Sequence, residues 1–267
     1  MAALSPTRLL TYRRCPREYR YAFVDGLARK FFRPRPQLTW GAAVHRALRE
    51  YGRALQERGS RDVDAALRAL RREWRPRGYQ DSDEAADDLD AASEALRVFD
   101  RWHAPGRARP VLVERRLRGR VAGVEIQGNV DWLDELPGGG LRLVDFKTGP
   151  RPGFSRLAGG AGGADSSQVD EEPLAPGSRA SLQLRWYAHL VRSRYEESPE
   201  IVVFHLRRGE ATPVPADAEA LAGAAAEAAE LAGRLAFDSE WAPAPGPHCT
   251  GCDFRSICPV WGGSDRG

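Results

Sequence analysis

Lysine is almost absent from this sequence. Among its 40 basic residues only Lys30 and Lys147 are lysines, and all the others are arginines. Lys147 follows a strand-like apolar run and stands two residues after Asp145. A lysine ammonium is a compact charge that can hold a water or a phosphate oxygen and can give up its proton, whereas the planar arginine guanidinium cannot. The position indicates a chemical role for Lys147, although chance placement of one of two lysines is an equal alternative for the residue taken alone.

Long apolar runs are missing too. None approaches the roughly 20 residues that span a membrane, and Arg13 and Arg14 interrupt the N-terminal region before a signal-peptide core could form. We therefore expect a cytoplasmic protein with no membrane partner. The Gly-x4-Gly-Lys-Ser/Thr phosphate loop is also absent, which excludes an ATP-driven motor within this sequence.

Charge of one sign is not in large excess, since the net charge is only +3. Bulk charge therefore does not identify a nucleic-acid-binding protein. Local clusters of basic residues at 13–20 and 29–35 could contact phosphates. An arginine-rich solvated surface is the alternative interpretation of these clusters.

Cysteine is scarce but clustered. Three of the four cysteines form the pattern Cys249-x2-Cys252-x5-Cys258, and Cys15 lies far away near the N-terminus. In a reducing compartment such cysteines are metal ligands or buried thiols rather than disulfides. A Cys-x2-Cys step places two thiolates on one metal centre, and Cys15 could complete a set of four. Zinc and an iron–sulfur cluster both remain open at this point.

Hydrophobic periodicity predicts an α/β fold with a mixed central sheet flanked by helices. We expect helices over 5–24, 41–57, 62–74, 83–103, 181–194 and 216–236. We expect strands over 111–114, 124–131, 141–146 and 200–206, with a turn at 137–140. Residues 157–180 are rich in Gly, Ser and Ala and predict a mobile loop. The whole chain is expected to be one domain, with a helical N-terminal part (5–105), a core (109–206) and a C-terminal helix and cysteine region (216–262).

Two acidic residues, Asp131 and Asp145, are each expected at the end of a strand, on strands that pair through the turn. Converging carboxylates repel one another unless a cation lies between them, and hard oxygen ligands suit Mg²⁺ or Mn²⁺. Lys147 is expected on the same face as Asp145. His45 is a further candidate ligand, although a lone helical histidine is more often packed or exposed. Gln183 and Tyr187 share a helix face and could bind a phosphate oxygen, or could be unrelated.

Four ordered motifs carry a family resemblance, and their residues are Gly41-x3-His45, Gly128-x2-Asp131, Asp145-Phe146-Lys147-Thr148-Gly149 and Gln183-x3-Tyr187. This series resembles the RecB-like branch of the PD-(D/E)XK nuclease superfamily from about residue 5 to the C-terminus. The resemblance implies a restriction-endonuclease-like core and a metal held by His45, Asp131, Asp145 and the main-chain carbonyl of Phe146. It implies Lys147 as the catalytic lysine, with Gln183 and Tyr187 as its helical partners. Glu114 falls where the branch often carries a Glu, and we expect it to support the ligands from outside or to pair with an arginine.

The cysteine spacing resembles the iron–sulfur version of the RecB-like nucleases, which includes CRISPR-associated members and the nuclease domain of a helicase–nuclease subunit. That resemblance favours a 4Fe–4S cluster over zinc, held by Cys15, Cys249, Cys252 and Cys258 and joining the two chain ends.

The function so implied is a metal-dependent DNA nuclease, expected to be an exonuclease on single strands or DNA ends in repair or recombination. Processive action on duplex DNA would require a helicase partner. A CRISPR-adaptation nuclease and a non-catalytic DNA-binding or scaffold module are the two alternatives.

Overall fold

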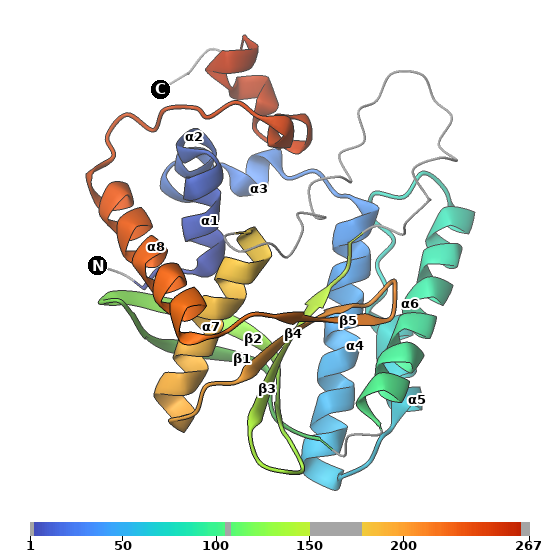
Figure 1. Ribbon diagram of the computed structural model, residues 1–267. Helices are drawn as coiled ribbons and strands as arrows, with labels where there is room; N and C mark the ends of the chain where they lie inside the picture. The colour runs from blue at the N-terminus through green and yellow to red at the C-terminus, as the bar shows by residue number, and fades with distance from the viewer. Residues whose placement is uncertain (1–2, 105–107, 150–177, 263–267) are drawn as a thin grey trace.

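The computed structural model describes residues 3–104, 108–149 and 178–262, and its centre is a five-stranded mixed sheet (Figure 1). The strands follow one another in chain order across the sheet: β1 (Arg109–Val121), β2 (Val124–Glu135), β3 (Leu141–Lys147), β4 (Glu200–His205) and β5 (Glu210–Val214). Only the β3–β4 pair is parallel, and the other pairs are antiparallel. The expected α/β architecture with a mixed sheet is confirmed.

Three helices cover one face of the sheet: α1 (Pro6–Arg14), α7 (Arg179–Tyr195) and α8 (Ala218–Phe237). The alanine-rich surface of α8 lets it approach α7 closely, and the Trp186 indole N–H donates to the Ala224 carbonyl at 2.6 Å. Burial of this apolar layer, rather than helix propensity, fixes the position of α7 against the sheet.

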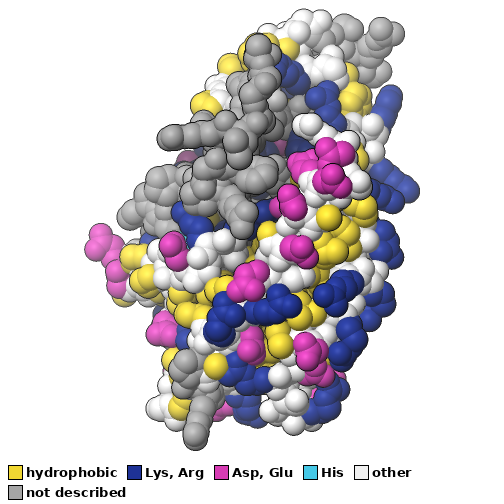
Figure 2. Space-filling view, turned by 90° about the vertical axis from the view of Figure 1, so that its right-hand side faces the viewer, with side chains coloured by type: hydrophobic (Ala, Val, Ile, Leu, Met, Phe, Trp, Pro, Cys, Tyr) yellow, Lys and Arg dark blue, Asp and Glu magenta, His cyan; other side chains and the backbone are white. Residues whose placement is uncertain are grey.

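The opposite face is covered by α4 (Pro36–Arg58), α5 (Val63–Glu73) and α6 (Ser82–His103). Its core is aromatic, with Trp40, Tyr51, Phe99, Trp132 and Phe204 among the fully buried side chains. The outer surface of this layer mixes arginine and acidic side chains (Figure 2), as expected of a solvated face.

The N-terminal helices and the C-terminal segment of the described chain lie together (Figure 1). After α8, the chain returns to the N-terminal helices, where the Tyr12 hydroxyl donates to Asp238 at 2.8 Å and the rings of Tyr19 and Trp241 stack at 5.7 Å. Three short 3-10 turns follow, at Pro247–Gly251, Arg255–Ile257 and Pro259–Trp261. In Figure 1 these turns lie beside α2 (Pro16–Tyr19) and α3 (Ala28–Phe31).

Several expected boundaries were wrong. The helix expected over 5–24 breaks at Cys15, which is extended (φ −160°, ψ 109°) because a residue before proline disfavours the helical conformation. Beyond this break lie α2 and a π-helix over Arg20–Val24. α4 begins at Pro36, five residues earlier than expected, with proline in its first turn.

The loop and strand predictions also need correction. Residues 157–177 of the expected loop lie outside the described residues, but Ser178 caps α7, and 179–180 are its first two residues. β5 was not predicted, because its five residues contain a proline and alternate poorly, as is typical of a short edge strand. Within the described residues, no helix is both long and apolar enough to cross a membrane.

Candidate active site and cysteine pocket

The two carboxylates of the site lie side by side on β2 and β3. Trp132 pairs with Val144, which sets Asp131 beside Asp145 in the same antiparallel register. The backbone N–H of Phe146 donates to Asp131 Oδ2 at 3.0 Å. Asp131 does not end its strand as expected, since β2 continues to Glu135, and β3 continues past Asp145 to Lys147. The convergence of the two carboxylates therefore comes from pairing within the sheet and not from strand ends.

Glu114 and His45 complete an acidic cluster with Asp131. On β1, Val113 pairs with Trp132 and Arg115 with Val130, so Glu114 lies opposite Asp131. His45 Nδ1, from α4, lies 2.8 Å from Glu114 Oε1 and 3.8 Å from Asp131 Oδ1. One ligand atom from each of the three side chains lies within 4.8 Å of the others, which is close enough for the three to hold one metal ion.

The backbone of Glu114 is itself unusual, with a φ of 46° inside a strand. A left-handed glutamate is strained, and such strain is concentrated at functional sites. Among the described residues, the Glu114 side chain contacts His45, and not an arginine, which was the alternative partner expected from the sequence. Sequence reasoning placed Glu114 outside the ligand set, whereas the structure places its carboxylate beside His45 and Asp131, where it could bind the same ion. The φ angle of a single residue leaves no mark in the sequence that could have revealed this.

Asp145 and Lys147 form the second part of the site. Lys147 Nζ lies 2.8 Å from Asp145 Oδ2, and the Asp145 residue is only 4% exposed. This confirms that Lys147 and Asp145 share a face of β3. Asp145 is not among the three residues whose ligand atoms cluster, but its charge is close enough to affect both His45 and Asp131.

The charged groups of the site shift one another's pKa values. Burial acts to lower the pKa of His45, but Asp131, Glu114 and Asp145 outweigh it and raise that pKa to about 9. Burial is also the largest cause that raises the pKa of Asp131, with Asp145 and Glu114 adding to it and His45 opposing. Without a metal the cluster therefore holds protons at neutral pH, and a divalent cation would take their place.

Tyr187 approaches the carboxylates from α7. Its side chain is buried, and the Gln183 amide donates to its hydroxyl at 3.5 Å. Burial raises the pKa of Tyr187, and the nearby charges of Asp131 and Asp145 raise it further. The structure therefore brings Tyr187 of the predicted helical pair, with Gln183 bonded to it, to the site from α7, whereas His45 reaches the same carboxylates from α4.

The motif glycines give these side chains room. A Cβ on Gly128 would lie 2.5 Å from Tyr187 Cε1, and one on Gly41 would lie 3.1 Å from Thr148 Oγ1. Gly128 thus admits the tyrosine ring, and Gly41 lets α4 approach the end of the Asp-Phe-Lys-Thr-Gly motif.

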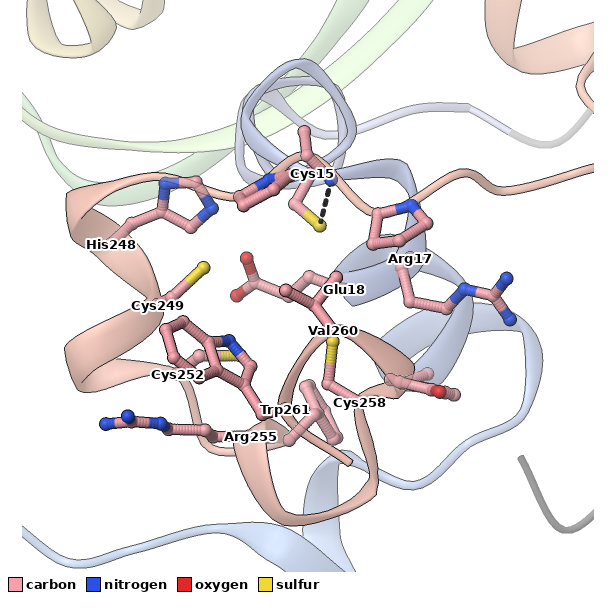
Figure 3. Close-up of a pocket in the computed structure, with 15 residues that line it drawn as sticks. Cys15, Arg17, Glu18, His248, Cys249, Cys252, Arg255, Cys258, Val260 and Trp261 are labelled. Carbon is pink, nitrogen blue, oxygen red and sulfur yellow. Dashed lines mark hydrogen bonds between the residues drawn. The ribbon is translucent and has the colours of Figure 1, made fainter. Parts of the chain in front are cut away.

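The four cysteines lie around one pocket, shown in Figure 3. All four are free thiols, and in Figure 3 their sulfur atoms point into a common space. Cys15 Sγ accepts the backbone N–H of Ala244 at 3.5 Å. Glu18, which is ion-paired with Arg14, projects its carboxylate into the same space. Burial raises the pKa of Cys252 to about 11, so this thiol is protonated when no cation is present.

The superfamily model for PD-(D/E)XK nucleases matches residues 3–259, nearly the whole chain. The chain belongs to the PD-(D/E)XK nuclease superfamily. Membership implies a hydrolytic, metal-dependent nuclease with DNA as substrate, and the cluster of His45, Glu114 and Asp131 could hold the metal.

Other comparisons add little to this assignment. The nuclease is similar to the solved structure titled "Crystal structure of SSO0001", with 15% identity over 97% of this chain and 86% of that chain, and a TM-score of 0.43. No curated protein matches the sequence.

Proposed function

We propose that this nuclease is a DNA exonuclease of the RecB-like branch that uses Mg²⁺ or Mn²⁺ and acts on single strands or DNA ends. The observation that carries the proposal is the convergence of His45, Glu114 and Asp131 within 4.8 Å, beside the Asp145–Lys147 pair. Hard carboxylate oxygens with one imidazole suit these two cations. Asp145 and the Phe146 carbonyl stay in the proposed ligand set by the family resemblance, and Glu114 joins it by geometry.

In the proposed mechanism, different residues bind the metal, orient the attacking water and contact the phosphate. A divalent ion bound at the cluster supplies Lewis-acid stabilisation of a phosphoryl oxygen and lowers the pKa of a bound water. Asp145 holds the Lys147 ammonium within 2.8 Å, so that it can orient the attacking water and offset charge on the phosphate. Gln183 and Tyr187 hydrogen-bond to a non-bridging oxygen. Cleavage leaves a 5′-phosphate.

The first test compares cleavage of end-labelled single-stranded and duplex DNA by the wild-type protein and by Asp145→Ala. Mg²⁺, Mn²⁺ and EDTA are compared, and Glu135→Ala is the matched control, because Glu135 is an exposed acid on β2. We expect metal-dependent cleavage that is lost in Asp145→Ala and kept in Glu135→Ala. Equal cleavage by the two variants, or robust cutting of closed circular duplex, would contradict the proposed site and substrate.

We also propose that Cys15, Cys249, Cys252 and Cys258 hold a 4Fe–4S cluster that joins the chain ends. All four cysteines line one pocket (Figure 3), which is the convergence that a shared metal centre requires. The choice of a cluster over a single zinc ion rests on the resemblance of the Cys15 and Cys249-x2-Cys252-x5-Cys258 pattern to the iron–sulfur nucleases.

The cluster is tested on protein purified without air. We expect a brown protein with broad absorbance near about 400 nm and roughly four irons per chain, both lost in Cys252→Ser. A colourless wild-type protein with one zinc per chain would overturn this assignment.

The remaining proposals concern the setting in which the nuclease works. Free thiols suit a reducing compartment, so we place the protein in the cytoplasm. We treat the chain as one domain, because α1 packs against α7 and α8, and residues near both ends share the aromatic contacts of Tyr19 and Trp241. A helicase partner would supply single strands from duplex DNA.

A further inference from the structure

The connector of residues 26–35, between the π-helix and α4, has an unusual composition. No acidic residue stands between Asp25 and Glu50 in the sequence. Within the connector Arg29, Lys30 and Arg33 are exposed, and Phe32 is 54% exposed. Isolated exposed apolar residues are ordinary on protein surfaces. An exposed phenylalanine flanked by three exposed cations is the combination that single-stranded nucleic acid recognises.

Neighbouring acids do not cancel this charge. Asp25 forms an ion pair with Arg20 at 3.4 Å, and Asp253 forms one with Arg35. Among the described residues, Arg29 and Arg33 take part in no ion pair. The connector therefore presents a net positive surface.

The connector is held against the cysteine turns, the C-terminal segment of 3-10 turns over residues 247–261 that contains Cys249, Cys252 and Cys258. Phe31 packs on Phe254 with ring centroids 6.0 Å apart, and the Arg35 guanidinium donates to the Gly251 carbonyl at 2.9 Å. Residues on both sides of Phe32 are thus anchored while Phe32 remains exposed. Because the flanking residues are held, the backbone at Phe32 loses little further conformational entropy when the ring binds a base.

The connector also leads directly to the catalytic cluster. α4 begins at Pro36, and His45 lies nine residues further along it, which corresponds to roughly 14 Å at 1.5 Å per residue. On the other side, the Tyr79 hydroxyl lies 3.4 Å from the Pro36 carbonyl, and the acidic start of α6 follows at Asp81.

We propose that residues 26–35 bind single-stranded DNA a few nucleotides from the scissile phosphate. Phe32 stacks on one base, and Arg29, Lys30 and Arg33 contact the backbone phosphates. Bases in a duplex are already stacked and paired, so Phe32 selects single strands whereas the cations attract either form. This inference rests on the proposed nuclease function and adds the surface that delivers its substrate.

The test measures binding of fluorescent single-stranded and duplex oligonucleotides to the full-length protein by anisotropy in EDTA, where no cleavage occurs. Phe32→Ala is compared with Phe237→Ala, a control phenylalanine that is 89% exposed at the end of α8. We expect Phe32→Ala to weaken single-strand binding about 5- to 150-fold, with little change for duplex and no effect of Phe237→Ala. Equal affinities of the two variants for single strands would overturn the proposal, and equal weakening for both forms of DNA would overturn its strand selectivity.

The cations are tested by a double variant, Arg29→Gln with Arg33→Gln, against Arg58→Gln with Arg71→Gln, which are exposed on α4 and α5. The slope of log K against log salt for single strands should fall by about 1.4 in the connector variant only, about 0.7 for each lost phosphate contact. An unchanged slope would show that Arg29 and Arg33 do not contact the phosphates of the bound strand.

These results are separable from the nuclease assignment. If Asp145→Ala abolishes cleavage while Phe32→Ala binds like wild type, the proposed DNA-binding role of the connector is wrong and the nuclease assignment stands. If Phe32→Ala loses binding while wild-type protein never cleaves, the binding surface stands and the proposed chemistry fails.

Discussion

At the scale of single residues, Gly128 gives the Tyr187 ring its place beside the carboxylates. In Gly128→Ala, the new methyl would lie 2.5 Å from Tyr187 Cε1, and a strand backbone paired on β1 cannot move away easily. We expect a loss of about 1–3 kcal/mol in the free energy of unfolding, as for other overpacked cores, together with reduced cleavage. Urea denaturation and the cleavage assay measure both. Gly138→Ala is the control, because nothing lies within 4 Å of its added Cβ, and equal effects of the two variants would contradict the steric account.

The proposed role of His45 as a metal ligand predicts that metal binding depends on pH. Its pKa is raised to about 9, so in the metal-free protein the imidazole is protonated at neutral pH and cannot bind a cation. Mn²⁺ affinity should therefore rise between about pH 6.5 and 9, with release of a proton. Calorimetry in two buffers of different ionisation enthalpy measures this release. His45→Gln should abolish most of it, and an unchanged release would exclude His45 as the titrating group.

The same shift has a consequence for the metal-free protein. The folded state holds the His45 proton more tightly than the unfolded chain, whose histidine pKa is near 6.5. The stabilisation is fully present below pH 6.5 and is lost as the pH rises through about 9. The melting temperature of the metal-free protein should fall over this range, and saturating metal should remove the fall.

At the scale of elements, a buried polar network ties α6 to β2 and β3. Asp134 accepts from the Trp132 indole at 2.6 Å and from Arg142 at 2.7 Å, and it lies 3.0 Å from His103. These contacts lower the pKa of Asp134 despite its burial. The network fixes β2 three residues beyond Asp131 and so supports the position of the Asp131 carboxylate.

Removal of Asp134 tests this support. Asp134→Ala leaves Arg142 and His103 without their carboxylate, and we expect a loss of about 3–5 kcal/mol in the free energy of unfolding. Glu135→Ala breaks an exposed pair with Arg109 on the same strand and should cost no more than about 1 kcal/mol. Chemical denaturation of the two variants gives the comparison, and similar losses would show that the network is not what anchors the strand.

The sequence predicts features that follow from local patterns, and it does not predict those that depend on backbone angles or on pairing between strands. The sequence predicted that Asp131 and Asp145 meet, but it placed both at strand ends, whereas β2 and β3 continue past them. The shared face of Asp145 and Lys147 was predicted correctly, because strand alternation is a local property of the sequence. Glu114 could not be assigned in this way, since its role depends on a left-handed φ and on its register against Asp131. The start of α4 was missed because Pro36 precedes the apolar face that marked the helix.

At the scale of the whole molecule, the sequence predicted the α/β class and the meeting of the chain ends, although the latter rested on four cysteines alone. The structure adds the contacts that accomplish it. Tyr12 bonds to Asp238, and Arg35 joins the start of α4 to the cysteine turns at Gly251 and Asp253. Such pairings between distant segments depend on the packing of the complete fold, which local patterns do not encode.

The parallel pairing of β3 with β4 has a practical consequence. Its ladder runs from Arg142 opposite Glu200 to Lys147 opposite His205, so the sheet is shared between residues 3–149 and residues 178–262. The first part carries His45, Glu114, Asp131, Asp145 and Lys147 but only one cysteine, and the second carries Gln183, Tyr187 and the other three cysteines. Two separate polypeptides divided between β3 and β4 would each lack part of the proposed active site and part of the proposed cysteine cluster. Their reassembly would be detected by the return of cleavage and of the absorbance expected of the cluster, which makes the protein a candidate for split-enzyme complementation.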